Sequence, residues 1–266
     1  MSHMRLITLT TDFGLEDTYV GVMKGVILGI NPAATIVDVC HAIPPQDVRA
    51  AAFLLHTSWR YFPPDTIHVV VVDPGVGSQR RAIAVDVGAA TFVAPDNGVL
   101  SYVLAEAAAK NTQAVHLINQ RYWLSQLSAT FHGRDIFAPV AAHLSLGVPL
   151  ADMGELLPIG ELVTFPLPCP ERHDDGAWVG HVVYVDHFGN LVTDLEAEVI
   201  GDTQAVVIKV GGRRIVGVRH TYADGTPGEP MALIGSSGRL EIAVPGGHAA
   251  RWLKAQIGDQ VRLDRT

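Results

Sequence analysis

Residues 67–81, which read IHVVVVDPGVGSQRR, place a run of four valines directly before an acid, a glycine-rich turn and two arginines. A run of β-branched residues that stops at turn residues is typical of a strand buried on both faces, as in a parallel sheet. Such a strand delivers the next residues of the chain to the carboxyl edge of the sheet, where open α/β folds bind ligands. Asp73 stands at that point, before a proline that favours extended backbone, and Arg80 comes after a short loop. This stretch therefore predicts a site as well as a core strand.

On both sides of this stretch, strands alternate with helices over about the first 150 residues. Short β-rich runs occupy residues 6–10, 35–39, 82–87, 91–94 and 114–117. Helical spacing or capping signals mark residues 17–30, 47–59, 99–110 and 131–146. In the first of these helices, either Asp17 or Thr18 would be the cap. This alternation predicts an α/β sandwich with a mostly parallel sheet.

The pattern changes after residue 157. Residues 158–170 are rich in proline and residues 171–176 are polar, which is typical of a linker. From Trp178 onward the runs are short, valine-rich and separated by glycines, which predicts a small β-barrel or sandwich, and only residues 247–255 have a helical pattern. We expect an N-terminal α/β domain at residues 4–157, a linker at 158–176 and a C-terminal β-barrel domain at 177–266. The leading MSHM resembles a cloning remnant, so the native chain is expected to begin at Met4.

Composition narrows the class of protein. Hydrophobic residues make up 48% of the 266 residues and charged residues 17%, which indicates a globular chain with a large core. The net charge of −8 and the lack of a basic block argue against nucleic acid as the partner, although a negative field would attract a cationic ligand. No apolar run approaches the roughly 20 residues of a membrane span, and no signal peptide is recognisable. Cys40 and Cys169 are far apart and match no metal spacing, so we expect reduced thiols in a cytoplasmic protein.

Asp73, Arg80 and His132 are the candidate chemical groups. An acid after a buried strand can simply cap a turn, but an arginine seven residues later favours a functional pair. His132 is either structural or an acid–base group, since its charge changes near neutral pH. Neither an HExxH motif nor a His/Cys cluster with zinc spacing is present, so no metal site is expected.

Two further groups of residues have both a structural and a functional reading. Asp12 and Asp17 are either a turn residue and a helix cap, or carboxylates that accept the hydroxyls of a ribose. The sequence DHFGN at 186–190 is either a hairpin turn or a site in which Asn190 reads an adenine edge with its donors and acceptors. The sequence GSSG at 235–238 is by itself a generic turn.

Six motifs occur in the order of one known family. They are TDFGLEDTYVG at 11–21, VDVCH at 37–41, VDPGVGSQRR at 72–81, FHGRD at 131–135, DHFGN at 186–190 and SSGRLEIAV at 236–244. Over nearly its whole length the chain resembles the S-adenosylmethionine hydroxide adenosyltransferases, which are relatives of the fluorinase and chlorinase enzymes.

The resemblance implies a cofactor-free hydrolysis of S-adenosylmethionine to adenosine and methionine, without a metal ion. It also implies an N-terminal α/β domain, a C-terminal β-barrel, and a homotrimer with each site between the N-domain of one subunit and the C-domain of its neighbour. The family's catalytic acid, arginine and histidine match Asp73, Arg80 and His132. Its adenosine-binding positions match Asp12, Asp73, Asn190, Ser236, Glu241 and Val244, and Asp17 and Asp186 align with acids near the ribose.

Two positions depart from the family pattern. Pro245-Gly246-Gly247 comes after the last motif and affects the expected backbone contacts to adenine, and Gln46 stands where fluorinases have an aromatic residue. Three alternatives stay open: a halide-using adenosyltransferase, a non-catalytic protein that binds adenosine or S-adenosylmethionine, and a metal-dependent hydrolase. The sequence does not decide which of Asp73 and His132 is the base.

Overall fold

The valine-rich stretch forms strand β3 (Thr66–Val71), and all six of its residues are buried. Strands β1 (Ile7–Thr11) and β5 (Ala90–Pro95) lie on either side of β3 and run parallel to it. The expected central strand of a parallel sheet is therefore confirmed in this computed structural model. Its carboxyl end leads directly to Asp73.

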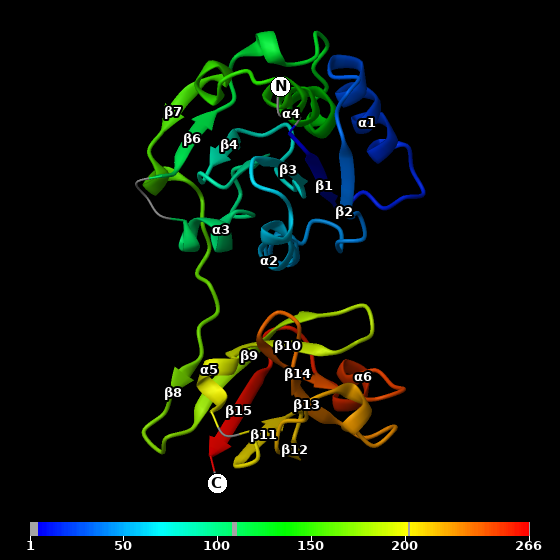
Figure 1. Cartoon of the computed structure of the whole chain (residues 1–266), viewed down its shortest axis with the longest axis vertical. Helices are drawn as coiled ribbons and strands as arrows, with labels where there is room; N and C mark the ends of the chain where they lie inside the picture. The colour runs from blue at the N-terminus through cyan, green and yellow to red at the C-terminus, as the bar shows by residue number, and fades with distance from the viewer. Residues whose placement is uncertain (1–4, 108–110, 202, 266) are drawn as a thin grey trace. The chain divides into compact units, whose positions relative to one another are not determined.

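The structure describes residues 5–107, 111–201 and 203–265. The expected start at Met4 and part of the expected helix at 99–110 lie outside the described residues. The chain divides into two units, Met1–Pro166 and Leu167–Thr266, which are called here the N-terminal and C-terminal units (Figure 1). The expected domain and linker boundaries at 157, 158–176 and 177 stay a prediction.

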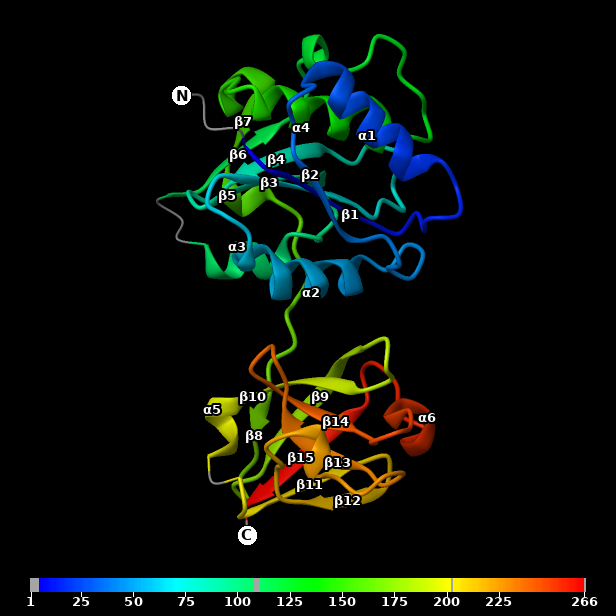
Figure 2. The same ribbon diagram turned by 45° about the vertical axis from the view of Figure 1, so that its right-hand side comes forward.

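The N-terminal unit is an α/β sandwich. Its other strands are β2 (Ile36–Cys40), β4 (Ala82–Asp86), β6 (Gln113–His116) and β7 (Glu155–Leu157), and its helices are α1 (Tyr19–Ile30), α2 (Val48–Ser58), α3 (Ser101–Glu106) and α4 (Ala138–Ser145). Short helical turns are η1 (Trp59–Tyr61), η3 (Gln120–Tyr122), η4 (Gly133–Phe137), η5 (Leu150–Met153) and η6 (Ile159–Glu161). Helices α1 and α4 cover one face of the sheet, and α2 and α3 cover the other (Figures 1 and 2).

The sheet has the order β2-β1-β3-β5-β4-β6-β7. Strands β2, β1, β3 and β5 are parallel, whereas β4, β6 and β7 pair antiparallel. Thr11 of β1 lies opposite Val71 of β3, so both strands end at the same level. The sheet therefore brings the segments that begin with Asp12 and Asp73 to one edge.

The C-terminal unit is an antiparallel, barrel-like sheet, as expected. Its elements are β8 (Glu171–Arg172), β9 (Trp178–Val185), β10 (Leu191–Glu196), α5 (Ala197–Ile200), β11 (Val206–Val210), β12 (Arg213–Val216), η7 (Tyr222–Asp224), β13 (Met231–Ile234), β14 (Arg239–Ala243), α6 (Ala249–Leu253) and β15 (Gln260–Arg265). The strand order is β12-β11-β15-β9-β10-β14-β13, with β8 paired to β9. A bridge between Arg219 and Leu233 joins the segment after β12 to β13 and so nearly closes the sheet. Within the described residues, no helix has the length and apolar character needed to cross a bilayer.

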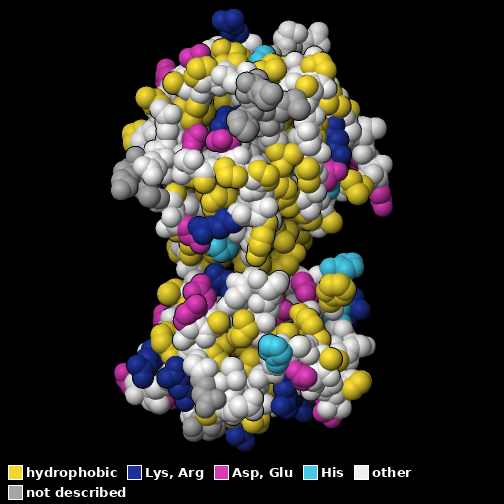
Figure 3. Space-filling view, viewed as in Figure 1, with side chains coloured by type: hydrophobic (Ala, Val, Ile, Leu, Met, Phe, Trp, Pro, Cys, Tyr) yellow, Lys and Arg dark blue, Asp and Glu magenta, His cyan; other side chains and the backbone are white. Residues whose placement is uncertain are grey.

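The charged side chains are mixed in sign on the surface that Figure 3 shows. Lysines and arginines are interspersed there with aspartates and glutamates over both units. This face therefore offers no continuous basic track for a phosphate backbone.

His68 is a buried polar residue of β3 and makes stability depend on pH. Its Nδ1 atom lies 2.8 Å from the Thr8 hydroxyl, and its ring stacks on Phe92 with centroids 5.1 Å apart. Burial lowers the pKa of His68 to about 4 from its ordinary 6.5. As the pH falls below 6.5, His68 therefore takes up a proton in the unfolded chain before it does so in the folded chain, and the folded chain loses stability.

We expect this histidine to destabilise the folded chain by roughly 3 kcal/mol as the pH falls from 6.5 to about 4. The double variant Thr8→Val/His68→Leu removes the titrating group and its hydroxyl partner together. Urea unfolding at pH 7 and pH 4.5 should show a smaller loss of stability for this variant than for the wild type. The exposed His220→Leu variant is the control, and an unchanged pH dependence in the double variant would contradict the assignment.

Candidate active site

Asp73, Arg80 and His132 meet in the N-terminal unit. The Arg80 Nε–H donates to both carboxylate oxygens of Asp73 at 2.9 and 3.0 Å, and an Nη2–H donates to Oδ2 at 2.5 Å. The same Nη2 lies 2.7 Å from His132 Nδ1. The side chains of Asp73 and Arg80 are only 6% and 10% exposed, so water screens this ion pair weakly. The structure thus joins His132 to the Asp73–Arg80 pair, which lies in a different motif.

Two glycines shape the loop that carries Arg80. Gly77 has φ +77°, and a Cβ added there would lie 2.3 Å from the carbonyl oxygen of Ala129. A Cβ on Gly75 would lie 3.2 Å from Arg80 Cγ. The Asp73–Arg80 loop can therefore fold against the segment before His132 because neither position carries a side chain.

His132 precedes η4, a single π-helical turn that continues into α4. Phe137, at the end of this turn, is buried and lies under the Arg80 guanidinium, which is 5.3 Å from the ring centroid. Asp135 in the same turn is fully buried and accepts a hydrogen bond from the Ser128 backbone N–H at 2.7 Å. This turn therefore fixes both His132 and the guanidinium beside it.

The guanidinium determines the protonation of His132. Because arginine can only donate, His132 Nδ1 must accept, and its proton is on Nε2 in the neutral ring. Burial, and then the Arg80 charge, lower the pKa of His132 below its ordinary value, whereas Asp73, Asp135 and a hydrogen bond with the Ser128 backbone oppose this. His132 is therefore a neutral imidazole whose acceptor nitrogen is already occupied.

Asp12 lies at the end of β1 and accepts a hydrogen bond from the Gln46 backbone N–H at 2.8 Å. Asp17 is exposed, and α1 begins two residues later with Thr18 as its N-cap, so Asp17 does not cap the helix. The carboxylates of Asp12 and Asp17 thus differ: Asp12 is held by the neighbouring loop, and Asp17 faces solvent.

Three aromatic rings, one of them on the residue before His132, form a cluster that the sequence analysis did not predict. Phe13, Tyr19 and Phe131 contact one another with ring centroids 5.1–5.8 Å apart. Gly133 packs against the same group, since a Cβ there would lie 3.2 Å from an atom of Phe131. Aromatic residues without regular spacing give no sequence signal for such a cluster.

A polar chain that runs from the surface pair Lys24–Asp38 to buried His41 supports the loop that begins at Thr11. Lys24 Nζ donates to Asp38 at 2.6 Å, and Asp38 Oδ1 lies 3.1 Å from His41 Nε2, off the ideal hydrogen-bond direction. His41 Nδ1 lies 2.9 Å from the Thr11 hydroxyl, which also accepts from the Phe13 N–H at 3.2 Å. The VDVCH motif therefore holds the backbone on both sides of Asp12.

In the C-terminal unit, Asp186 and Asn190 are joined across a hairpin turn. The Asn190 backbone N–H donates to Asp186 Oδ1 at 2.8 Å, and its side-chain Nδ2–H donates to Oδ2 at 2.9 Å. Asn190 is only 8% exposed. The hairpin reading of DHFGN is correct, and the same turn fixes the Asn190 amide.

Glu241 on β14 lies near this turn and has a partner that no motif predicted. Tyr222 in η7 donates its hydroxyl to Glu241 Oε2 at 2.9 Å. Burial raises the pKa of Glu241, the Tyr222 hydrogen bond opposes this, and the charge of Asp186 raises the pKa further. Burial and the hydrogen bond to Glu241 raise the pKa of Tyr222 to about 12. Two acids and an un-ionised phenol thus form a region suited to a cationic ligand.

The remaining predicted positions also lie in the C-terminal unit. Ser236 is in the turn between β13 and β14, where a Cβ on Gly235 would lie 1.8 Å from a Glu241 carboxylate oxygen. Val244 comes directly after β14 and is buried, and its carbonyl accepts from the Gly247 N–H at 2.8 Å. Pro245-Gly246-Gly247, which departs from the family pattern, therefore forms a tight turn that is closed by the hydrogen bond to the Val244 carbonyl.

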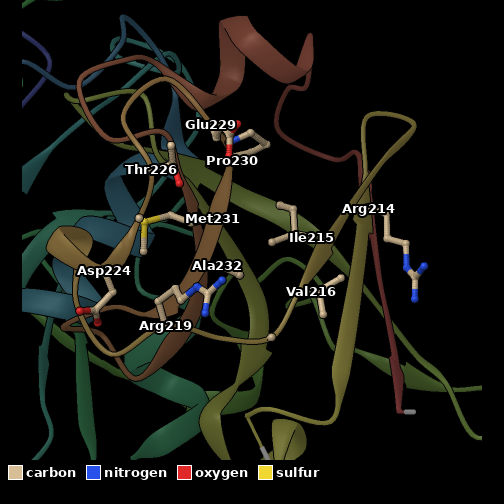
Figure 4. Close-up of a pocket in the computed structure, with 12 residues that line it drawn as sticks. Arg214, Ile215, Val216, Arg219, Asp224, Thr226, Glu229, Pro230, Met231 and Ala232 are labelled. Atoms are coloured by element: carbon tan, nitrogen blue, oxygen red, sulfur yellow. The ribbon is translucent and has the colours of Figure 1, made fainter.

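A separate hollow of about 190 Å³ opens in the C-terminal unit (Figure 4). Arg219, Asp224, Glu229 and Met231 line it, whereas the Arg214 side chain points away from the others. None of the predicted site residues lines this hollow. Among the described residues, no group of three or more His, Cys, Asp or Glu side chains is placed to hold a metal ion. The metal independence of the reaction stays a prediction.

Family comparison matches each of the two units to a domain of one family. Residues 7–154 match the S-adenosylmethionine hydroxide adenosyltransferase N-terminal domain, and residues 180–262 match the C-terminal domain of the same family. The chain therefore belongs to the S-adenosylmethionine hydroxide adenosyltransferase family.

Among individual relatives, the (R)-S-adenosyl-L-methionine hydrolase of Salinispora arenicola is 42% identical over 97% of both chains. The protein of the same name from Thermus thermophilus is 41% identical over 98% of this chain and 100% of its own. A fluorinase of Actinoplanes sp. is 31% identical over 90% of both chains. A solved structure of an uncharacterized conserved protein from Thermotoga maritima superposes with a TM-score of 0.89 at 38% identity, over 98% of this chain and 100% of the other.

Proposed function

We propose that this protein hydrolyses S-adenosyl-L-methionine to adenosine and L-methionine by attack of water on the ribose C5′ carbon. The observation that carries the proposal is the partly buried Asp73–Arg80–His132 constellation at the carboxyl edge of the sheet. The full-length similarity to (R)-S-adenosyl-L-methionine hydrolases supports the same substrate, with the R configuration at sulfur as the preferred epimer.

The leaving group needs no acid. Methionine departs as a neutral thioether because the sulfonium loses its charge when the C–S bond breaks. The nucleophile is the difficult partner, since water is weak and one proton must be lost. Positioning the water in line with the C–S bond, and excluding other water, supplies much of the rate.

We propose that the Asp73 carboxylate accepts the proton that the attacking water loses. His132 Nδ1 is occupied by Arg80, whereas the Asp73 carboxylate retains lone-pair positions beyond its bonds to Arg80. A carboxylate is a weak base. A weak base suffices, because attack by neutral water produces a protonated alcohol, which is a strong acid. His132 then holds the guanidinium in place.

Substrate recognition is proposed to use residues of both units. On the N-terminal unit they are Asp12, Asp17 and Asp73, and on the C-terminal unit they are Asp186, Asn190, Ser236, Glu241 and Val244. Asp12 would accept the ribose hydroxyls, and Asn190 would face the adenine base. The acids of the C-terminal unit supply the negative field that a sulfonium substrate needs.

The assembly and surroundings are inferred from family resemblance. We propose a cytoplasmic homotrimer with its sites at subunit interfaces, a reaction without cofactor or metal, and a domain boundary in the stretch 158–176. Light scattering tests the trimer, and full activity in excess chelator tests the metal independence.

The decisive experiment incubates purified protein with each sulfonium epimer of S-adenosylmethionine in halide-free buffer and monitors the products by chromatography. Equal amounts of adenosine and methionine are expected, preferentially from the R epimer. His132→Ala should lower the rate about 10²-fold, because Arg80 loses its 2.7 Å contact with the ring and a displacement of about 1 Å near the reacting groups costs about that factor. Arg60→Ala, which changes an exposed arginine, should not.

The outcome of the same assay separates the alternatives. Chloride-dependent 5′-chloro-5′-deoxyadenosine would indicate a halide-using transferase. Bound adenosine without turnover would indicate a binding protein, and loss of activity with chelator would indicate a metal-dependent hydrolase.

A further inference from the structure

Asn190 is held in one orientation by the turn around it. Besides its two bonds to the Asp186 carboxylate, Asn190 accepts a hydrogen bond at its backbone carbonyl from the Asp186 N–H at 3.1 Å. Gly189, at φ +86°, packs so closely on His248 that a Cβ would lie 2.1 Å from the ring. The backbone of Asn190 is therefore held in place by this turn.

The Asp186 carboxylate also determines the orientation of the Asn190 side-chain amide. Asp186 Oδ2 can only accept, so the atom 2.9 Å away must be Nδ2. A flipped amide would place two oxygens against each other in a largely buried site. Asn190 Oδ1 must therefore point away from Asp186, and it accepts no hydrogen bond from residues 5–107, 111–201 or 203–265.

This orientation has a consequence for base recognition. Adenine presents a donor at N6 and an acceptor at N7, and an asparagine matches this pair with its oxygen and one N–H. A 6-oxo purine presents two acceptors on the same edge. An amide that is free to rotate would adapt to the 6-oxo group by turning Nδ2 toward it, but the Asp186 contact prevents this rotation.

We propose that Asp186 is a positioning residue that locks the Asn190 amide and so makes the site specific for 6-aminopurines over 6-oxopurines. The proposal rests on the proposed placement of the base at Asn190. Both Asp186 oxygens are engaged by Asn190, so the carboxylate acts on the base through the amide. The structure accordingly assigns Asp186 a role in specificity that is separate from any contact with the ribose.

The test compares adenosine with inosine, which differ at the 6-position, by calorimetric titration of the full-length protein. The wild type should bind adenosine roughly 10- to 100-fold more tightly, the discrimination expected of one bidentate asparagine contact. Asp186→Asn keeps an acceptor for the Asn190 backbone N–H but allows either orientation of the amide. In this variant the preference should fall to within a few-fold, with adenosine weakened and inosine unchanged or tighter.

Asp259→Asn is the matched control, because Asp259 also accepts a backbone N–H in a turn of the same unit, at 2.8 Å from Gln256 N. Its adenosine preference should equal that of the wild type. A merely structural role of Asp186 would weaken both nucleosides by the same factor and keep the ratio, which would overturn the proposal. Equal binding of the two nucleosides by the wild type would overturn it as well.

The kinetic counterpart separates this proposal from the proposed function. Hydrolysis of S-adenosylmethionine and S-inosyl-L-methionine should show the same ratio in kcat/KM as the binding data. If neither substrate is hydrolysed while adenosine and inosine still differ in affinity, the hydrolase assignment fails and the role of Asp186 stands. If S-adenosylmethionine is hydrolysed and the inosyl analogue reacts equally well, the role of Asp186 fails and the hydrolase assignment stands.

Discussion

Asp73→Asn is expected to lower kcat for adenosine formation about 10²–10⁴-fold, the range for loss of a positioned proton acceptor. The substitution keeps the size of the side chain but removes the charge that holds Arg80 in a bidentate contact. Once Arg80 is released, its 2.7 Å contact with His132 is released too. The variant therefore loses the proton acceptor and the geometry around it together. Single-turnover formation of adenosine from S-adenosylmethionine is the measurement.

Loss of folding must be separated from loss of chemistry in this experiment. Removing one partner of a buried ion pair costs about 3–5 kcal/mol, so Asp73→Asn should also unfold more easily. The neutral pair Asp73→Asn/Arg80→Gln leaves no unpaired charge and should recover stability without recovering turnover. Asp65→Asn is the control: it makes the same change at an exposed position just before β3. Wild-type turnover in the neutral pair would remove both residues from the mechanism.

Gly77→Ala is expected to lower kcat roughly 100-fold, although Gly77 provides no side chain to the reaction. The new Cβ would lie 2.3 Å from the Ala129 carbonyl oxygen, so the Asp73–Arg80 loop must move away from the segment before His132. A displacement of about 1 Å between reacting groups can cost about 10²-fold in rate. Steady-state kinetics at saturating S-adenosylmethionine measure this loss.

Gly147→Ala is the matched control for this substitution. Gly147 lies in the same unit and also has a positive φ, +88°, but a Cβ there meets nothing within 4 Å. Both variants carry the backbone strain of about 1–2 kcal/mol for a left-handed residue, whereas only Gly77→Ala has the clash. Similar turnover in the two variants would show that the loop contact does not set the rate.

The parts of the structure predicted correctly from the sequence are those with local signals. The buried strand β3 is evident from its unbroken β-branched run, and the Asp73–Arg80 pair from seven residues of one loop. The expected helix at 47–59 is equally local, and it is found as α2 at Val48–Ser58. In such cases the cause of the structure and its signal lie in the same few residues.

The parts that the sequence did not reveal depend on contacts between distant segments. Tyr222 reaches Glu241 from a segment without a motif, and Gly77 is required by a carbonyl that lies 52 residues further along the chain. The orientation of the Asn190 amide depends on a proton position that a sequence pattern does not encode. The start of α1 was predicted with either Asp17 or Thr18 as its cap, and the structure has Thr18 in this position.

The π-helical turn Gly133–Phe137 has a consequence for comparing members of the family. A π-turn contains one more residue than the α-helical turn it replaces. Deleting one residue from it would leave an ordinary α-helical turn, so His132 and α4 would keep nearly the same directions relative to each other. His132 would then still point toward Arg80. When sequences of relatives are aligned, a one-residue gap between this histidine and α4 is therefore compatible with the same geometry, provided that all three side chains are present.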